Sequence, residues 1–247
     1  MSEPSAAADE IRIDLATGAV SQREAGDAPA SGSQPAGSVS ALWLAPPGAR
    51  AALALAHGAG AGMRHAFMES LAAALARAGV ATLRYQFPYV EAGRRRPDRP
   101  PALEATVRAA AAAAARLAPE LPLVAGGKSM GGRMTSRAQA AEPLPGVRGL
   151  VFYGFPLHPA GRPGTERADH LAAVALPMLF LQGTRDNLAD LELLRPVLDR
   201  LGPRAEIAVL DGADHSFKLP ARIARGAPPV ADQLAALTAA WAERVAR

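Results

Sequence analysis

Short apolar runs alternate with longer amphipathic stretches along most of the chain. Six runs are short, mostly apolar and bounded by glycine, proline or polar residues, which is typical of buried strands; they span residues 51–56, 80–85, 121–125, 147–153, 178–181 and 205–210. The longer stretches are expected to be helices at 66–78, 102–117, 188–201 and 230–245, with one more after Ser129 that fades near Pro143. This alternation predicts an α/β fold in which helices cover both faces of a mostly parallel sheet.

The first 38 residues have a weaker pattern. Residues 11–15 alternate between apolar and polar side chains, which predicts an edge strand, whereas residues 18–38 are rich in Gly, Ala, Ser and Pro and are expected to form a long loop or a disordered link. A further strand is expected at 39–44, and no internal repeat or second domain boundary follows it. We therefore expect a flexible N-terminal segment over residues 1–38 and a single α/β domain over residues 39–247.

The composition fits a globular enzyme, with 49% hydrophobic and 20% charged residues. There is no cysteine, which excludes disulfides, a thiolate nucleophile and zinc sites built on cysteine. The start of the chain lacks the basic and apolar stretches of a signal peptide, and no run is long enough to span a membrane, so we expect a cytoplasmic protein without a membrane partner. The net charge is +4, but arginine is spread along the chain and aromatic residues make up only 4%, so no nucleic-acid partner is expected.

The segment around Ser129 has the pattern of a nucleophile elbow. The strand expected at 121–125 is followed by Gly-Gly-Lys-Ser-Met-Gly-Gly and then by a helix, which is the strand–turn–helix context that the motif requires. The turn is so tight that the residues two before and two after the serine must be small, and Gly127 and Gly131 meet this need. The backbone N–H of Met130, at the start of the helix, is expected to bind a developing oxyanion.

Two nucleotide-binding motifs compete with this interpretation. Gly-Lys-Ser also ends a phosphate-binding P-loop, but that motif needs a glycine five residues before Gly127, where the chain has Pro122. His-Gly-Ala-Gly at residues 57–60 follows a strand, as in a dinucleotide fingerprint, but the glycine spacing fails and no acidic residue ends the next strand. We interpret this loop instead as the source of a second oxyanion N–H, from Ala59, with His57 as a structural hydrogen-bonding residue.

An acid and a histidine follow the serine in the order that this motif requires. Asp186 comes just after the strand expected at 178–181, and His215 comes just after the strand expected at 205–210. Because the carboxyl ends of parallel strands meet at one edge of a sheet, we expect Ser129, Asp186 and His215 to form a catalytic triad there. Each also has a simpler interpretation, Asp186 as a helix cap and His215 as a surface histidine. The competing acids are Asp190, expected inside a helix, and Asp211 and Asp214, on the loop of the histidine.

Five segments together match a known superfamily: His-Gly-Ala-Gly at 57–60, Arg-Tyr-Gln-Phe-Pro-Tyr at 84–89, Gly-Lys-Ser-Met-Gly-Gly at 127–132, Gln-Gly-Thr-Arg-Asp at 182–186 and Gly-Ala-Asp-His at 212–215. On these residues the chain resembles the α/β-hydrolase superfamily over about residues 39–247. Within it, the chain is similar to a small, lidless branch related to dienelactone hydrolases. Dienelactone hydrolases proper use a cysteine nucleophile, and this chain has none, so their lactone substrate does not carry over.

The surroundings of the expected site give two hints about the substrate. Many relatives insert a cap domain where this chain has only residues 154–177, which suffices for a loop or a short helix, so we expect an open site for accessible or polar esters. Lys128 adjoins the serine, and Arg94 and Arg95 lie on an arginine-rich segment that follows the strand at 80–85. These three are candidate substrate-binding residues, and with Arg133 they would form a cationic rim that steers an anionic substrate. The alternative is a solvated loop paired with local acids.

The expected reaction is two-step acyl transfer from a small-molecule acyl substrate, with Ser129 as nucleophile, His215 as general base and Asp186 as the group that orients the histidine. No metal or organic cofactor is needed. Two alternatives stay open: a hydrolase-like binding or scaffold protein without activity, and a peptidase or thioesterase on the same fold. The oligomeric state is also open, because Trp241 and its helix can pack internally or against a partner.

Overall fold

The computed structural model describes residues 7–22 and 37–246. Within them, nine strands form one sheet: β1 (Asp9–Asp14), β2 (Val20–Gln22), β3 (Ser38–Leu44), β4 (Ala51–Ala56), β5 (Val80–Tyr85), β6 (Leu123–Lys128), β7 (Val147–Tyr153), β8 (Met178–Arg185) and β9 (Ala205–Asp214). Their order across the sheet is β2-β1-β3-β5-β4-β6-β7-β8-β9. The six strands from β4 to β9 run parallel to one another, and β1, β2 and β3 are antiparallel additions at one side.

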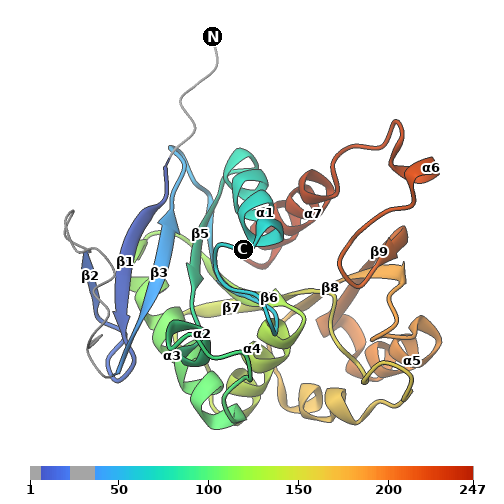
Figure 1. Ribbon diagram of the computed structural model, residues 1–247, viewed down its shortest axis with the longest axis horizontal. Coiled ribbons are helices and arrows are strands. Elements are labelled where there is room, and N and C mark those ends of the chain that lie inside the picture. The colour runs from blue at the N-terminus through green and yellow to red at the C-terminus, as the bar shows by residue number, and fades with distance from the viewer. Residues whose placement is uncertain (1–6, 23–36, 247) are drawn as a thin grey trace.

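Helices cover both faces of this sheet, as Figure 1 shows. They are α1 (Ala66–Arg77), α2 (Pro88–Glu91), α3 (Pro100–Leu117), α4 (Met130–Ala141), α5 (Leu191–Leu201), α6 (Ala221–Ala224) and α7 (Val230–Val245), with short 3₁₀ turns η1 (Glu166–Ala173) and η2 (Gly202–Arg204). Helices α1 and α7 pack on one face, whereas α3, α4 and α5 pack on the other. The predicted α/β fold, with a mostly parallel sheet between two helical layers, is confirmed.

The alternation of side chains along β4 explains how the two layers are separated. Leu53 and Leu55 point into the core shared with α1 and α7, whereas the small residues Ala52, Ala54 and Ala56 point toward α3 and α4. Helix α3 itself presents a run of buried alanines to the sheet. Because the side chains on both surfaces are small, α3 can approach the sheet closely, and the two surfaces pack without leaving a void.

Several element boundaries differ from the sequence predictions. Strands β6, β8 and β9 continue beyond their apolar runs to Lys128, Arg185 and Asp214, because backbone pairing does not end where the side chains become polar. The strand expected at the edge of the sheet, β1, lies between β2 and β3; the edge is β2, which falls in the segment that we predicted to be a loop. The rest of that segment, residues 23–36, lies outside the described residues.

The connection between β7 and β8 carries only the short 3₁₀ turn η1, which agrees with the expectation of little or no cap domain.

Trp241 on α7 is 1% exposed, and a Cβ added at Gly149 on β7 would meet its indole ring. Of the two placements considered for Trp241, the internal one is therefore confirmed. None of the helices among the described residues combines the length and apolar character that a membrane crossing demands.

Candidate active site

Ser129 occupies a strained turn between β6 and α4. Its φ of 50° lies in the left-handed region, which a residue with a side chain rarely adopts. Gly131 allows this turn to pack, because a Cβ there would lie 2.5 Å from the carbonyl oxygen of His57. A Cβ at Gly127 would collide with the carbonyl oxygen of Ala56. Both positions of the predicted elbow that need small residues therefore require glycine. A side chain at either position would collide with the end of β4 or with the loop after it.

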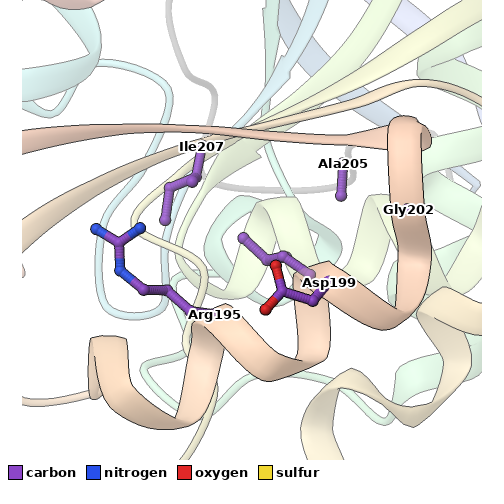
Figure 2. A pocket seen from close by; sticks show the side chains of 6 residues that line it. Arg195, Asp199, Gly202, Ala205 and Ile207 are labelled. Atoms are coloured by element: carbon purple, nitrogen blue, oxygen red, sulfur yellow. The ribbon is translucent and has the colours of Figure 1, made fainter.

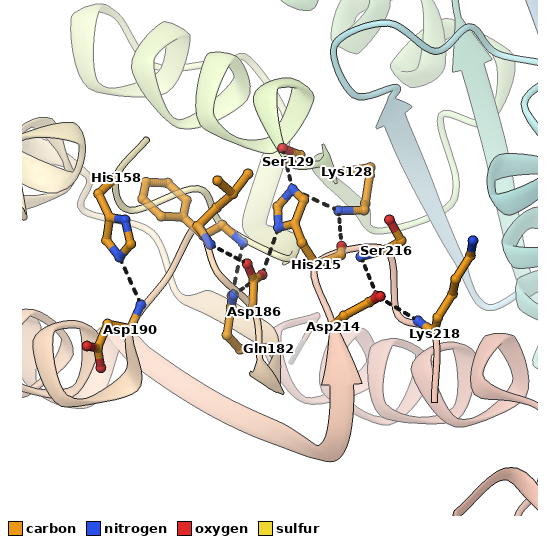
Figure 3. A network of polar contacts seen from close by, with 12 residues as sticks. Lys128, Ser129, His158, Gln182, Asp186, Asp190, Asp214, His215, Ser216 and Lys218 are labelled. Atoms are coloured by element: carbon orange, nitrogen blue, oxygen red, sulfur yellow. Dashed lines mark hydrogen bonds and ion pairs between the residues drawn. The ribbon is translucent and has the colours of Figure 1, made fainter. Parts of the chain in front are cut away.

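Three side chains form a continuous chain of hydrogen bonds at the carboxyl ends of β6, β8 and β9 (Figure 3). The Oγ atom of Ser129 lies 2.9 Å from Nε2 of His215, and Nδ1 of His215 lies 2.8 Å from Oδ2 of Asp186. An ionised carboxylate can only accept, so Nδ1 carries the ring proton and Nε2 is free to accept from the serine. The structure therefore brings together the serine, histidine and acid that the sequence analysis singled out.

Asp186 is placed by several donors and is only 6% exposed. Its Oδ1 atom accepts a hydrogen bond from the backbone N–H of Leu188 at 2.8 Å, so it does shape the turn before α5. The expectation that Asp190 lies inside a helix is wrong. Helix α5 begins three residues later than predicted, at Leu191, and Asp190 is its N-cap, accepting from the N–H of Glu192 at 2.9 Å.

The other two competing acids also have structural partners. Oδ1 of Asp214 accepts from the backbone N–H groups of Ser216 at 2.8 Å and Lys218 at 2.9 Å, which builds the turn that presents His215. Oδ1 of Asp211 accepts from the hydroxyl of Thr184 at 3.3 Å. Only Asp186 among the four contacts the imidazole of His215.

The loop after β4 borders the serine. A Cβ added at Gly58 would lie 3.7 Å from Cβ of Ser129, which places the neighbouring Ala59 beside the turn. The N–H of Met130 begins α4 and has no partner within its own helix. Neither this N–H nor that of Ala59 donates to another group in the part of the chain that the structure describes. Two unused backbone donors therefore lie next to Ser129.

His57 is fully buried and holds this loop in place. Its Nδ1 atom lies 2.8 Å from the carbonyl oxygen of Gly58, and its Nε2 atom accepts from the N–H of Phe87 at 3.2 Å. The proton therefore sits on Nδ1. Burial lowers the pKa of His57 to about 4, so the ring is neutral near pH 7. These contacts fit the structural role that we expected for His57.

The three cationic residues expected to bind substrate lie in different surroundings. Lys128 is part of the site, but its Nζ atom donates to the carbonyl oxygen of His215 at 2.7 Å and lies 3.3 Å from Nε2 of the same residue. Arg94 and Arg95 are exposed, and Arg94 pairs with Asp98 at 2.7 Å. Among the described residues, no hydrogen bond or ion pair joins either arginine to the triad.

Two residues without an assigned role in the sequence analysis complete the site. Gln182 on β8 is fully buried, donates to Oδ2 of Asp186 at 2.6 Å and accepts from the N–H of Phe155 at 3.0 Å. Gly154 has a φ of 71°, and a Cβ there would lie 3.2 Å from Nζ of Lys128 and 3.5 Å from Cε1 of His215. The only sequence signal for Gln182 was an amide directly after the apolar run of β8.

A separate cavity of about 400 Å³ lies between α5 and the start of β9 (Figure 2); its lining comprises Arg195, Leu198, Asp199, Gly202, Ala205 and Ile207. Ala205 begins β9 and His215 follows its end, so the cavity and the triad lie at opposite edges of the sheet. The cavity therefore contributes nothing to the site. Within residues 7–22 and 37–246, no group of three or more His, Asp or Glu side chains is placed to hold a metal ion.

The fold and this site can be compared with known proteins. The chain is similar to a dienelactone hydrolase from Anabaena variabilis, with 18% identity, a TM-score of 0.70 and coverage of 98% of this chain and 99% of the other. It is also similar to a serine hydrolase without a lid from Xanthomonas campestris, with 21% identity, a TM-score of 0.61 and coverage of 87% and 88%. A third likeness is to Est1E from Butyrivibrio proteoclasticus, with 16% identity, a TM-score of 0.60 and coverage of 87% and 98%. These likenesses show a shared fold. A family model described as the alpha/beta hydrolase domain matches residues 49–243, and the chain therefore belongs to the alpha/beta hydrolase family, as the sequence motifs predicted.

Proposed function

We propose that this protein is a serine hydrolase that cleaves a carboxylic ester, or a related acyl bond, of a small molecule through an acyl-enzyme. One observation carries the proposal: the hydrogen-bonded chain from Ser129 through His215 to Asp186, with the serine on a strained turn at the start of a helix. A serine hydroxyl is a poor nucleophile unless an adjacent base takes its proton, and this geometry supplies the base. Membership of the alpha/beta hydrolase family supports the same conclusion.

In the first step, Oγ of Ser129 forms a bond to the ester carbonyl carbon while Nε2 of His215 takes the hydroxyl proton. The carbonyl electron pair moves to oxygen, which becomes an oxyanion. When the tetrahedral intermediate collapses, the bond to the leaving alkoxide breaks and His215 donates the proton to it. Water then attacks the acyl-enzyme, His215 takes one proton from the water, and that proton returns to Ser129 as the acid is released.

The residues around the triad have distinct tasks in this scheme. Asp186 fixes the tautomer of His215 and stabilises the positive charge that the ring gains, and Gln182 holds Asp186 in place. The unused N–H groups of Met130 and Ala59 would receive the oxyanion, a contribution of about 3 kcal/mol for each donor. The chemistry needs no cofactor beyond these groups.

Covalent labelling tests the proposal. A fluorophosphonate should add one adduct to the wild-type chain by intact mass, and Ser129→Ala should abolish it. Ser136→Ala is the matched control, because Ser136 also lies 2.7 Å from a histidine nitrogen, that of His170, but is buried. Labelling that survives Ser129→Ala would remove Ser129 from its role. A folded wild-type chain that never labels would favour a binding or scaffold protein instead.

The bond that is cleaved requires a second measurement. Rates on p-nitrophenyl esters, acyl-CoA thioesters and peptide amides should be compared for the wild-type protein and Ser129→Ala. We expect the highest Ser129-dependent rate on the esters. A higher Ser129-dependent rate on thioesters or amides would leave the nucleophile intact and reassign the enzyme to the corresponding class.

A further inference from the structure

Two arginine side chains lie where η1 packs against α4. Arg133 lies on α4 and Arg167 on η1, and both are partly buried. In residues 7–22 and 37–246, neither guanidinium makes a hydrogen bond or an ion pair. The Nε atom of Arg133 is itself shielded from solvent without a partner. A buried donor without an acceptor is costly, so this arrangement needs an explanation.

The charges that act most strongly on Arg133 are mostly positive. The pKa of Arg133 is lowered first by burial and then by the charges of Arg167 and Arg137, while Glu104 acts in the opposite direction. Glu104 already pairs with Arg137, with 2.6 Å between its Oε1 and the arginine Nε. The one carboxylate that acts favourably on Arg133 is thus already paired with Arg137, and the charges of Arg133 and Arg167 repel each other.

A buried contact holds η1 against α4, the two elements that carry the two arginines. Nε2 of His170 lies 2.7 Å from Oγ of Ser136, and this hydroxyl donates to the carbonyl oxygen of Arg133 at 3.0 Å. Burial, with Arg133 and Arg137, lowers the pKa of His170 to about 4, so the ring adds no charge near pH 7. Ser136 is fully buried and its proton is already donated, so this second serine–histidine pair serves to join η1 to α4.

Arg133 is one helical turn from Ser129. Its N–H donates to the carbonyl oxygen of Ser129 at 3.1 Å. Residues four apart lie on the same face of a helix, separated by about 6 Å along its axis, and their side chains lean toward the helix N-terminus. Helix geometry therefore directs the side chain of Arg133 toward the end of α4 that carries Ser129.

We propose that Arg133 and Arg167 form a binding site for a carboxylate or phosphate group of the substrate, close to the carbonyl that Ser129 attacks. This inference rests on the proposed function and names its substrate class: an acyl ester that carries an anion a few bonds from the scissile carbonyl. A planar guanidinium presents two parallel donors that match the oxygens of these anions. The anion would satisfy the unpaired donors and remove the repulsion between the two arginines. Of the cationic rim that the sequence suggested, this site keeps Arg133, and it adds Arg167 in place of Lys128, Arg94 and Arg95.

Substrate preference gives the first test. Rates on mono-p-nitrophenyl glutarate, which carries a free carboxylate, should be compared with those on p-nitrophenyl butyrate, which is neutral. Arg133→Gln and Arg167→Gln should each lower kcat/KM for the glutarate ester about tenfold or more, because each removes a charge-assisted hydrogen bond, and leave the butyrate ester within about twofold. The matched control Arg195→Gln, at an exposed arginine of α5 away from the site, should change neither. Equal losses on both esters, or no loss on the glutarate ester, would overturn the proposal.

The second test does not depend on catalysis. Ser129→Ala protein should bind glutarate or inorganic phosphate saturably in a calorimetric titration, and adding Arg133→Gln or Arg167→Gln should abolish the heat. The tighter of the two anions identifies whether a carboxylate or a phosphate is the natural group. Absence of saturable binding by both anions would overturn the site, even if labelling had already established Ser129 as the nucleophile. Binding without any esterase activity would keep the anion site and reject the proposed function.

Discussion

The Nζ atom of Lys128 lies 3.3 Å from Nε2 of His215, the same nitrogen that faces Oγ of Ser129 at 2.9 Å. The lysine is held there by its bond to the carbonyl oxygen of His215 at 2.7 Å and lies 5.5 Å from the ring centre of Phe217. A positive charge on Lys128 therefore acts directly on the nitrogen that would take the serine proton in the proposed reaction. Its charge state is expected to govern the reaction.

The pH profile of esterase activity tests this relationship. Burial lowers the pKa of Lys128 to about 8, although Asp186 and Asp214 act to raise it, so the ammonium loses its proton as the pH rises through this value. In the proposed reaction, the charged form would oppose the positive charge that His215 gains in the transition state. We therefore expect kcat on p-nitrophenyl butyrate to rise between pH 7 and 9.

The matched pair Lys128→Met and Lys218→Met isolates the cause of that rise. Lys128→Met should remove the increase between pH 7 and 9, because no charge is then lost. Lys218→Met should keep it, because Lys218 lies on the same loop as His215 but its side chain makes no hydrogen bond or ion pair within the described residues. A rise that persists unchanged in Lys128→Met would show that another group controls the profile.

Asp186→Asn should cost far more activity than stability. The amide can still accept from Leu188, but it cannot stabilise the imidazolium and favours the wrong tautomer of His215, so kcat should fall by about 10⁴-fold. Asp190→Asn is the matched control, because asparagine also caps helices well, and its rate and unfolding midpoint should stay near those of the wild type. Ester kinetics and urea unfolding of both variants measure the difference. A loss of less than tenfold in Asp186→Asn would mean that another group orients the histidine.

The meeting of Ser129, Asp186 and His215 could be predicted from the sequence because it follows from the fold. Parallel strands end at the same edge of a sheet, so residues that follow β6, β8 and β9 must meet there. The order Ser129, Asp186, His215 and the glycines around the serine then sufficed to choose among the residues at that edge. The positions of the parallel strands along the chain could also be predicted, because each contains a short apolar run.

Features that depend on side-chain direction or on distant pairing could not be predicted. The sequence places Lys128 beside the serine, but only the packing of the His215 loop turns its Nζ atom toward the imidazole. Strand β2 is short and polar, and it forms because β1 offers a free edge. Asp190 was placed inside α5 because the polar run before Leu191 does not distinguish a cap from a first turn.

Gly131→Ala should destabilise the fold and disturb the site together. The added Cβ would lie 2.5 Å from the carbonyl oxygen of His57, so α4 must shift away from β4, at a cost of about 2 kcal/mol or more. The shift would also move the N–H of Met130. Gly58→Ala, whose Cβ would meet its nearest neighbour at 3.5 Å, should stay within about 1 kcal/mol of the wild type. Urea unfolding compares them, and equal losses in the two variants would contradict the packing argument.

Acid should destabilise this protein through His57. Burial holds the pKa of His57 at about 4, against 6.5 for a free histidine, so between these values the unfolded chain binds a proton that the folded chain does not. His57 alone should therefore lower the free energy of unfolding by up to about 3 kcal/mol as the pH drops from about 6.5 to about 4. His170, whose pKa is also lowered to about 4, should add to the fall in the wild type and in any His57 variant alike. His57→Gln can still accept from Phe87, and it should be less stable at pH 7 but lose less on acidification. Urea unfolding at pH 7, 6, 5 and 4 measures both slopes, and parallel slopes in the two proteins would show that His57 is not the group that takes up the proton.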